Sequence, residues 1–255
     1  MHKNTNRIIS LSPSSTEILY ALGVGDLVVG VTHFCDEPLA AKEKTKIGDW
    51  VNIAPERIQT LNPDLLISST IVQQNAQERF RDLGVDILHL DPRSLDGIFG
   101  SILAIADRLR IFPRGEELVR QMKQSIEDIK RQSSGVLRRV YMEEWSHPPM
   151  VSGNWVPDMV EAAGGVYGII RKGEVSRAFD DKEILDFDPE VIILSICGAG
   201  ERVDTERVYN REKWQSLAAV KNKNVFVIHD SLVNRPGPRV VEGIRRLQEM
   251  IRASR

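Results

Sequence analysis

The chain has 255 residues, of which 42% are hydrophobic and 27% are charged. This is enough for a sizeable core, arranged as one large domain or as two of medium size. Its 34 Lys and Arg residues against 36 Asp and Glu residues leave a net charge of -2, which excludes the positive field that a nucleic-acid-binding protein needs.

No apolar run approaches the roughly 20 residues that span a bilayer, and no apolar leader precedes the first expected strand. If Met1 is the native start, this favours a cytoplasmic protein. Cys35 and Cys197 are too few for a disulfide framework, so a bridge between them and the redox compartment both stay undecided.

Strands alternate with helices through the first part of the chain. Aliphatic runs predict strands at 7–11, 27–31, 64–68 and 85–90. Helical spacing of apolar residues, with glycine stops and an initial proline, predicts helices at 18–22, 55–61 and 76–83. This alternation is typical of a parallel sheet covered by helices on both faces, so we expect an α/β fold.

The second half repeats this order of elements. Strands are expected at 139–142, 190–195 and 225–229, and helices at 157–163, 181–187 and 240–251. Three segments recur in the same order: 17–23 resembles 158–164, "LNPDLLIS" at 61–68 resembles "FDPEVIIL" at 187–194, and 85–89 resembles 225–229. The middle pair predicts a helix that passes through an Asn/Asp-Pro turn into a buried strand. We therefore expect two similar α/β lobes.

The segments 95–109 and 114–132, between these lobes, are expected to be helical. In the second segment Leu118, Met122, Ile126 and Ile129 form one apolar stripe. A helix of ~19 residues is ~28 Å long and would act as a stiff strut. The predicted organisation is an N-terminal lobe at 1–112, a connecting helix at 113–134 and a C-terminal lobe at 135–255.

The loops beyond the carboxyl ends of the strands are the expected ligand site, because open parallel sheets bind ligands there. Three of the four tryptophans, Trp50, Trp145 and Trp155, lie in these loops. An aromatic side chain on a loop is exposed unless something covers it, either a flat, largely apolar ligand or the facing lobe.

The segment "SPSSTE" at 12–17 matches a capping box, in which Ser or Thr precedes Glu by three residues. Two interpretations stay open: the segment only caps the start of the helix, or its free amides and hydroxyls also bind a ligand amide or carboxylate. Arg235 and Arg239 lie in a stiff proline-rich loop, where guanidinium groups suit carboxylates, phosphates or amide oxygens. Arg239 also suits an ion pair at the start of the last helix.

The loop 32–38 brings His33, Cys35, Asp36 and Glu37 together, which raises the question of a metal site. The spacing matches no Cys-x-x-Cys or His-Glu-x-x-His motif. Further ligands would have to come from the other lobe: His147, His229 and Asp230. A turn with solvated acids is the preferred interpretation, and no metal is predicted. No nucleophile elbow, Walker loop or dinucleotide fingerprint occurs, so an enzyme is not expected.

These segments together resemble a known family. The stretch 7–38, "IGDW" at 47–50, "PERIQTLNPDLLI" at 55–67, "GVDILHLD" at 84–91, "SGNWVPDMVEAAGG" at 152–165, "DPEVIIL" at 188–194 and "RPGPR" at 235–239 carry the resemblance. They are similar, in order and over nearly the whole chain, to the substrate-binding proteins of ABC transporters for cobalamin and ferric siderophores, most closely to the cobalamin-binding branch.

The resemblance implies two doubly wound Rossmann-like lobes, joined by one long helix, with a ligand cleft between them. It implies a periplasmic or extracytoplasmic monomer that delivers cobalamin or a related corrinoid, as transported ligand and not as cofactor, to an ABC permease. Trp50 would lie against the corrin, and the 12–17 loop would form a wall of the cleft. The expected ligand-binding residues are Ser12, Pro13, Ser14, Ser15, His33, Phe34, Trp50, Trp145, Trp155 and Arg235. One glutamate on each lobe would dock the permease: Glu78, and either Glu201 or Glu206.

The composition of the loops bears on the ligand class. A corrin has a broad apolar face rimmed by amides, and stacking an indole on it buries on the order of 100 Å², worth ~2–3 kcal/mol. A ferric siderophore is often anionic and should prefer Arg and Tyr, but none of the four tyrosines lies in these loops. Three alternatives stay open: a ferric-siderophore or haem-binding protein of the same family, a cytoplasmic corrinoid-handling protein or enzyme, and a metal-ion receptor using His33 and His229. Axial ligation of cobalt by His33 or His147 is a separate hypothesis.

Overall fold

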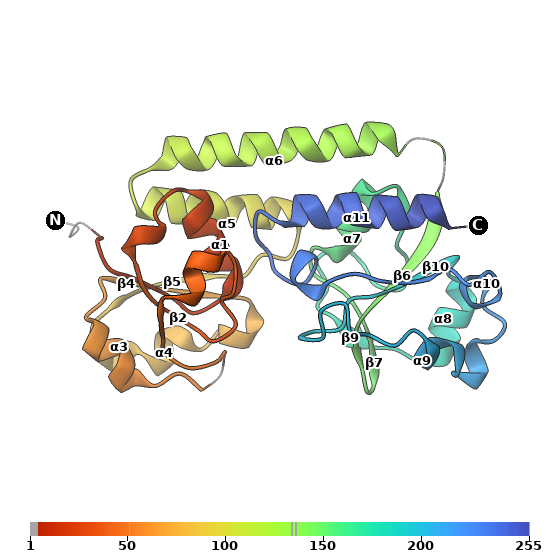
Figure 1. Ribbon diagram of the computed structural model, residues 1–255, viewed down its shortest axis with the longest axis horizontal. Coiled ribbons are helices and arrows are strands. Elements are labelled where there is room, and N and C mark those ends of the chain that lie inside the picture. Colours follow the sequence, from red (N-terminus) through yellow and green to blue (C-terminus); the bar gives the residue numbers. More distant parts are fainter. Residues whose placement is uncertain (1–4, 51, 134, 136, 255) are drawn as a thin grey trace. The chain divides into compact units, whose positions relative to one another are not determined.

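The computed structural model describes residues 5–50, 52–133, 135 and 137–254, and the chain forms two compact units (Figure 1). Unit 1 comprises Met1–Pro92 and Asp96–Gln121, and unit 2 comprises Arg93–Leu95 and Met122–Arg255. Each unit has its own sheet. Within the described parts of the chain, no helix combines the length and apolarity needed to cross a membrane.

The sheet of unit 1 consists of five parallel strands in the order β3-β2-β1-β4-β5. The strands are β1 (Ile8–Ser10), β2 (Val28–Val31), β3 (Thr45–Lys46), β4 (Leu65–Ser69) and β5 (Asp86–Leu90). The central strands β1 and β4 are buried throughout, which explains their aliphatic runs. The four expected strands are confirmed. Strand β3 was not expected, because its two residues contain no aliphatic run.

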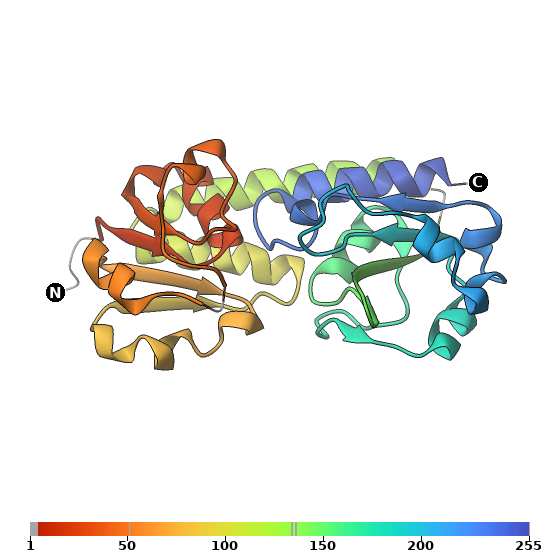
Figure 2. The same cartoon turned by 60° about the horizontal axis from the view of Figure 1, so that its bottom comes forward.

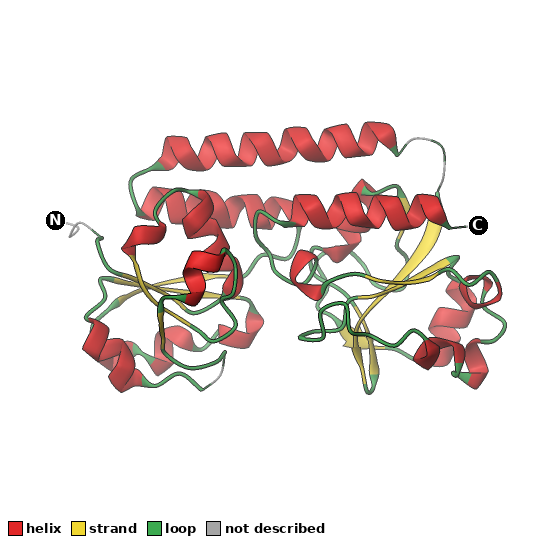
Figure 3. Cartoon of the chain, in the orientation of Figure 1, coloured by secondary structure: helices red, strands yellow, loops and turns green. Residues whose placement is uncertain are grey.

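Helices cover both faces of this sheet (Figures 1 and 3). On one face lie α1 (Pro13–Ala21) and α5 (Leu95–Arg108), and on the other α3 (Pro55–Leu61) and α4 (Ala76–Arg79). On the second face, Ile58 of α3 and the neighbouring Phe80 form one core cluster with Ile9, Leu66 and Ile47. The helix expected at 76–83 is interrupted at Phe80 (φ -110°), and a 3₁₀ turn, η3 (Arg81–Leu83), follows. The short α2 (Leu39–Lys42) was not expected.

The sheet of unit 2 is mixed and contains six strands. They are β6 (Arg138–Ser146), β7 (Pro149–Val151), β8 (Gly165–Val166), β9 (Arg177–Ala178), β10 (Val191–Leu194) and β11 (Val225–Val227). Strands β11, β10, β6 and β8 are parallel neighbours, whereas β7 is antiparallel to both β6 and β9. The expectation of a purely parallel sheet is wrong here, because β6 continues past Met142 to Ser146 and the chain returns as β7.

The helix α6 (Phe112–Gln132) runs without a break from unit 1 into unit 2, as the periodicity of 114–132 predicted. Its apolar stripe includes the buried Met122, Ile126 and Ile129. In unit 2, α7 (Val156–Ala162) packs against α11 (Val240–Ala253), drawn in blue in Figure 2. The Nε2 atom of Gln248 on α11 donates to the Ile129 carbonyl of α6, 2.7 Å away. The remaining helices of unit 2 are α8 (Asp181–Phe187), α9 (Glu206–Tyr209) and α10 (Ala218–Lys221).

The repeated sequence has one structure in both units. Helix α3 ends at Asn62 and α8 ends at Asp188, and both caps have left-handed backbone conformations, with φ of 41° and 44°. Asn and Asp tolerate this region better than other side chains except glycine. In each case the following proline leads directly into a buried strand, β4 or β10.

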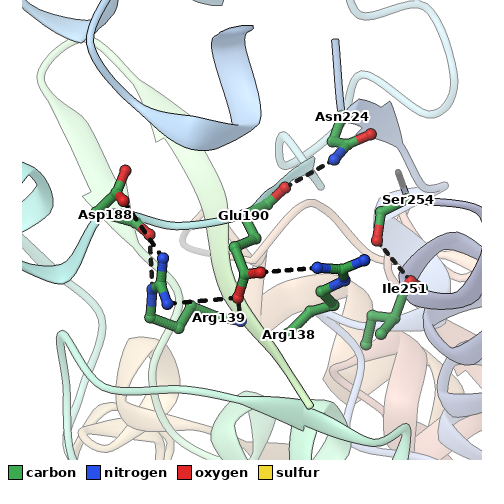
Figure 4. Close-up of polar contacts among 7 residues, drawn as sticks. All are labelled: Arg138, Arg139, Asp188, Glu190, Asn224, Ile251 and Ser254. Carbon is green, nitrogen blue, oxygen red and sulfur yellow. Dashed lines mark hydrogen bonds and ion pairs between the residues drawn. The ribbon is translucent and has the colours of Figure 1, made fainter. Parts of the chain in front are cut away.

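The acid that follows this proline anchors the first strand of its unit. The N–H of Arg7 donates to Asp64 Oδ2 at 3.0 Å, and the N–H of Arg139 donates to Glu190 Oε2 at 3.1 Å. Figure 4 shows the second case, in which Arg138 Nη1 also donates to the Glu190 carboxylate at 2.8 Å. In both units these hydrogen bonds tie the amino end of the first strand, β1 or β6, to the start of its parallel neighbour, β4 or β10.

The strand orders confirm the repeat. In unit 1 the parallel order β2-β1-β4-β5 corresponds to β8-β6-β10-β11 in unit 2. The helix that follows the central strand is α1 in unit 1 and α7 in unit 2, which are the two segments that resemble each other in sequence. Both units therefore have the same α/β topology, and unit 2 adds β7 and β9. The expected fold class, two doubly wound α/β lobes, is confirmed.

Candidate ligand-binding site

The carboxyl ends of β1, β2, β3 and β4 meet at one edge of the unit 1 sheet, because these strands are parallel. Among the described residues of the loops that follow them, four large apolar side chains stay exposed: Phe34 (49%), Trp50 (39%), Ile71 (45%) and Val72 (49%). Apolar side chains gathered at the ligand-binding edge of an α/β sheet indicate a surface that a partner covers. We call these four residues the apolar edge of unit 1.

Two loops of the apolar edge are joined to each other. The ring centroids of Phe34 and Trp50 lie 5.3 Å apart with their planes inclined by 58°, a favourable arrangement for two aromatic rings. The N–H of His33 donates to the Gly48 carbonyl at 2.8 Å, which connects the two loops through the backbone. The side chain of His33 is exposed beside them.

Trp50 lies in a tight turn between Gly48 and Ile53, which form an antiparallel bridge. The N–H of Asn52 donates to Asp49 Oδ1 at 2.6 Å and closes the turn. Gly48 has a φ of 138°, and a Cβ atom at this position would lie 2.1 Å from the Asn52 carbonyl oxygen. A glycine is therefore required for the turn that presents Trp50.

The segment 12–17 caps helix α1, but not as the sequence predicted. The cap is Ser12, whose Oγ accepts from the N–H of Ser15 at 3.3 Å, so the capping box that ends at Glu17 is wrong. The helix begins at Pro13, which suits the first helical position because it has no N–H to satisfy.

The hydroxyl groups of this segment bond mainly to one another. Ser12 Oγ donates to Ser15 Oγ at 2.8 Å and lies 3.2 Å from Ser14 Oγ. Ser12, Ser14 and Ser15 are exposed by 6%, 3% and 0%. All three serines are therefore buried, and a direct contact with a ligand stays a prediction.

The two expected tryptophans of unit 2 differ in environment. Trp145 is 48% exposed near the end of β6, and its Nε1 donates to the His147 carbonyl at 3.1 Å. Trp155 is only 5% exposed, and its Nε1 donates to the Val233 carbonyl at 2.7 Å. The expectation that the Trp155 indole is offered on a loop is wrong. Trp155 is the N-cap residue of α7, and its hydrogen bond to the Val233 carbonyl holds the indole in the core.

The loops at the carboxyl end of the unit 2 sheet are polar. Both oxygens of the Asp230 carboxylate accept backbone N–H groups, from Gly198 at 2.9 Å and from Gly200 at 3.0 Å. Arg235 and Arg239 are half-buried in the following loop, and Arg239 Nη2 donates to Ser231 Oγ at 3.3 Å. Asp230 thus shapes the 198–200 turn.

The two cysteines are free and unreactive in this environment. Burial, together with the negative charges of Glu144 and Asp230, raises the pKa of Cys197 to about 12. Burial also raises the pKa of Cys35. Both thiols therefore stay protonated at neutral pH, so neither is a good nucleophile or metal ligand. Among the residues that the structure describes, no group of three or more His, Cys, Asp and Glu side chains could hold a metal ion.

The expected docking glutamates all lie on the surface. Glu78 is exposed on α4 of unit 1. In unit 2, Glu201 is exposed in the turn after β10, and Glu206 is the exposed first residue of α9. Their accessibility is compatible with a protein contact, and their role in docking stays a prediction.

One residue behind the apolar edge was missed. Gln73 is 7% exposed and reaches backbone groups of three separate segments. A glutamine in a polar loop sequence such as "VQQN" carries no signal of burial, so only the tertiary structure identifies it.

The comparisons with known proteins agree with this architecture. The family model described as "Periplasmic binding protein" matches residues 8–232. An uncharacterized ABC transporter substrate-binding lipoprotein, YvrC of Bacillus subtilis, is 29% identical, covering 98% of this chain and 81% of its own. The crystal structure of the periplasmic vitamin B12-binding protein BtuF of Vibrio cholerae is similar with a TM-score of 0.78 and 27% identity, over 98% of this chain and 97% of its own. The crystal structure of a protein from Staphylococcus epidermidis, described as a "possible" iron-binding (periplasmic solute-binding) protein, is similar with a TM-score of 0.84 and 27% identity. The similarity covers 98% of this chain and 99% of that protein.

Proposed function

Because the chain belongs to the periplasmic binding protein family, we propose that it captures cobalamin or a related corrinoid and delivers it to an ABC importer. Proteins of this family are extracytoplasmic and non-enzymatic, and work with ABC transporter permeases. They carry a transported ligand and not a cofactor. The family that the sequence resembles is thereby confirmed, and so is the expectation that the protein is not an enzyme.

The observation that carries the proposal is the apolar edge of unit 1. Phe34 and Trp50 lie close enough to act as one aromatic surface, and Ile71 and Val72 extend its apolar character along the same edge. A corrin ring is broad and apolar on its faces, so it can cover several such side chains at once. Burial of ~100 Å² of apolar surface by one indole is worth ~2–3 kcal/mol, and the four side chains together exceed this.

The tyrosines argue against a ligand that needs phenolate groups. Ferric iron is bound well by phenolate oxygen. Tyr20 lies in α1 and Tyr209 in α9. Tyr141 is fully buried, and the hydroxyl of Tyr167 donates to the Ser152 carbonyl at 2.7 Å. None of the four belongs to the apolar edge.

Calorimetry tests the proposal directly. The protein is titrated with cyanocobalamin, with dicyanocobinamide, with haemin and with a ferric hydroxamate siderophore. Submicromolar binding of the two corrinoids, and much weaker binding of the iron compounds, is the expected result. Tight binding of haemin or of the siderophore without any heat from a corrinoid would overturn the proposal.

A haem-binding function is the second candidate, and the exposed His33 favours it. An imidazole beside two aromatic rings could occupy an axial position on haem iron, as it could on cobalt. A change in the Soret band of haemin, or in the visible spectrum of aquocobalamin, would reveal such a bond. His33→Ala should abolish the change, whereas His147→Ala, on the exposed hairpin of unit 2, provides the comparison.

A further inference from the structure

Gln73 lies at the end of the 3₁₀ turn η2 (Ile71–Gln73), directly after β4, and its side chain points below the apolar edge of unit 1. Its Oε1 accepts from the N–H of Ser69 at 3.0 Å. Its Nε2 donates to the Leu11 carbonyl at 2.7 Å and to the Trp50 carbonyl at 3.4 Å. One side chain therefore connects the segments that follow β1, β3 and β4.

The partners determine which way the amide is oriented. The N–H of Ser69 can only donate, and the carbonyls of Leu11 and Trp50 can only accept. Oε1 must therefore face Ser69, and Nε2 must face the two carbonyls. A carboxylate in the same place would set a negative charge against two carbonyl oxygens, and an apolar side chain would leave three backbone groups, two of them in buried hydrogen bonds, without this partner.

The turn that carries Trp50 is also joined to neighbouring segments at its two ends. Its first residue, Gly48, accepts from the N–H of His33, and Arg79 Nη2 donates to the carbonyl of Ile53 at 3.0 Å. Both contacts lie at the ends of the turn. Gln73 reaches the backbone of Trp50 itself, the residue whose indole the turn presents.

We propose that Gln73 is the positioning residue of this site: it holds the Trp50 turn against the end of β1, so that the indole is presented next to Phe34. Gln73 itself need not touch the ligand, because it is nearly buried. Its effect on affinity rests on the function proposed above, whereas its effect on Trp50 is measurable without any ligand.

Fluorescence of the ligand-free protein tests the positioning. In a Trp145→Phe background Trp50 is the only exposed tryptophan, because Trp155 and Trp214 are 5% and 2% exposed. Gln73→Glu and the neutral Gln73→Met are compared with Gln74→Glu, a change at the exposed neighbour. We expect greater quenching by acrylamide and lower anisotropy in both Gln73 variants, and parental values in Gln74→Glu.

The pH dependence separates positioning from a general loss of packing. At about pH 4.5, a buried glutamic acid is largely protonated. Its single hydroxyl can then donate to one of the two carbonyls while its other oxygen accepts from Ser69, so Gln73→Glu should recover part of the parental protection from quenching. Gln73→Met has no titrating group and should not recover.

The affinity for cyanocobalamin provides the second readout. A loss of about tenfold is expected for Gln73→Glu at neutral pH, with Gln74→Glu unchanged. Parental quenching and anisotropy in a folded Gln73→Met would overturn the positioning role, even if Gln73→Glu fails to fold. If no corrinoid binds to the parent protein, the proposed function fails, but the fluorescence still decides the role of Gln73.

Discussion

The rings of Trp50 and Phe34 lie 5.3 Å apart at the end of the unit 1 sheet, although Trp50 follows β3 and Phe34 follows β2. Each ring keeps a large part of its surface exposed while touching the other. The pair is thus held in place without being covered, which is what a binding surface for a flat ligand requires.

Trp50→Ala should weaken cyanocobalamin binding by roughly 30- to 150-fold, which corresponds to the ~2–3 kcal/mol lost when the indole no longer covers the ligand. Phe34→Ala should have a smaller effect, because Phe34 offers less area. Calorimetry measures both. Leu137→Ala removes a more exposed apolar side chain (75%) from unit 2 and should leave the affinity unchanged. Equal affinity in Trp50→Ala and the parent would exclude Trp50 from the site.

The buried carboxylate of Glu143 stabilises unit 2 through Arg211. Glu143 is fully buried and accepts two hydrogen bonds from Arg211, at 2.6 and 2.8 Å, and one from the Tyr141 hydroxyl at 2.9 Å. Glu143→Ala leaves the guanidinium in a mostly buried place without its partner, which typically costs ~3–5 kcal/mol. Urea unfolding measures the loss.

Asp181 provides the control for this pair. It makes an ion pair with Lys213 at 2.6 Å, but both side chains are exposed. Asp181→Ala should therefore lower the free energy of unfolding by less than ~1 kcal/mol. Similar losses in the two variants would contradict the structural role of the Glu143–Arg211 pair.

Glu144 makes stability depend on pH. Burial raises the pKa of its carboxyl above the ordinary value of 4.5, and a hydrogen bond from Ser176 opposes only part of this shift. Between pH 4.5 and the raised pKa, the folded state holds a proton that the unfolded state has lost. The free energy of unfolding should therefore fall as pH rises through this window, and level off above the folded pKa.

Glu144→Gln removes the titrating group and should flatten this part of the pH profile, with a gain in stability at neutral pH. Unfolding in urea at several pH values gives the profile. Glu201→Gln, at an exposed acid of the same unit, should keep the parental profile. A profile that Glu144→Gln leaves as steep as in the parent would show that Glu144 is not the group responsible.

The exposed glutamates should matter for transport and not for capture. Glu78→Lys and the double variant Glu201→Lys, Glu206→Lys should bind cyanocobalamin like the parent, because these side chains lie outside the apolar edge. They should fail to stimulate the ATPase of the cognate importer reconstituted in vesicles, since charge reversal turns attraction to permease cations into repulsion. Glu212→Lys, an exposed acid elsewhere in unit 2, should stimulate normally.

Much of the fold could be predicted from local sequence. The aliphatic runs of β4 and β10, the proline start of α3, and the Asn62 and Asp188 turns are visible within a few residues, and the repeat between the halves follows from their order. The short strands β3, β7 and β9 could not be predicted. Two or three residues carry no periodicity, and these strands exist only because a neighbouring strand pairs with them.

The candidate site shows the same division. Trp50, Phe34 and the 12–17 segment were found because loops after parallel strands are recognisable in the sequence. The burial of Trp155 and the three hydrogen bonds of Gln73 depend on segments far away along the chain, such as Val233 and Leu11. The sequence by itself determined the elements and their repetition, since turn chemistry and hydrophobic period act between near neighbours. Only the tertiary structure decided which side chains are exposed and which are bonded, because burial and hydrogen bonding are properties of segments that meet in space.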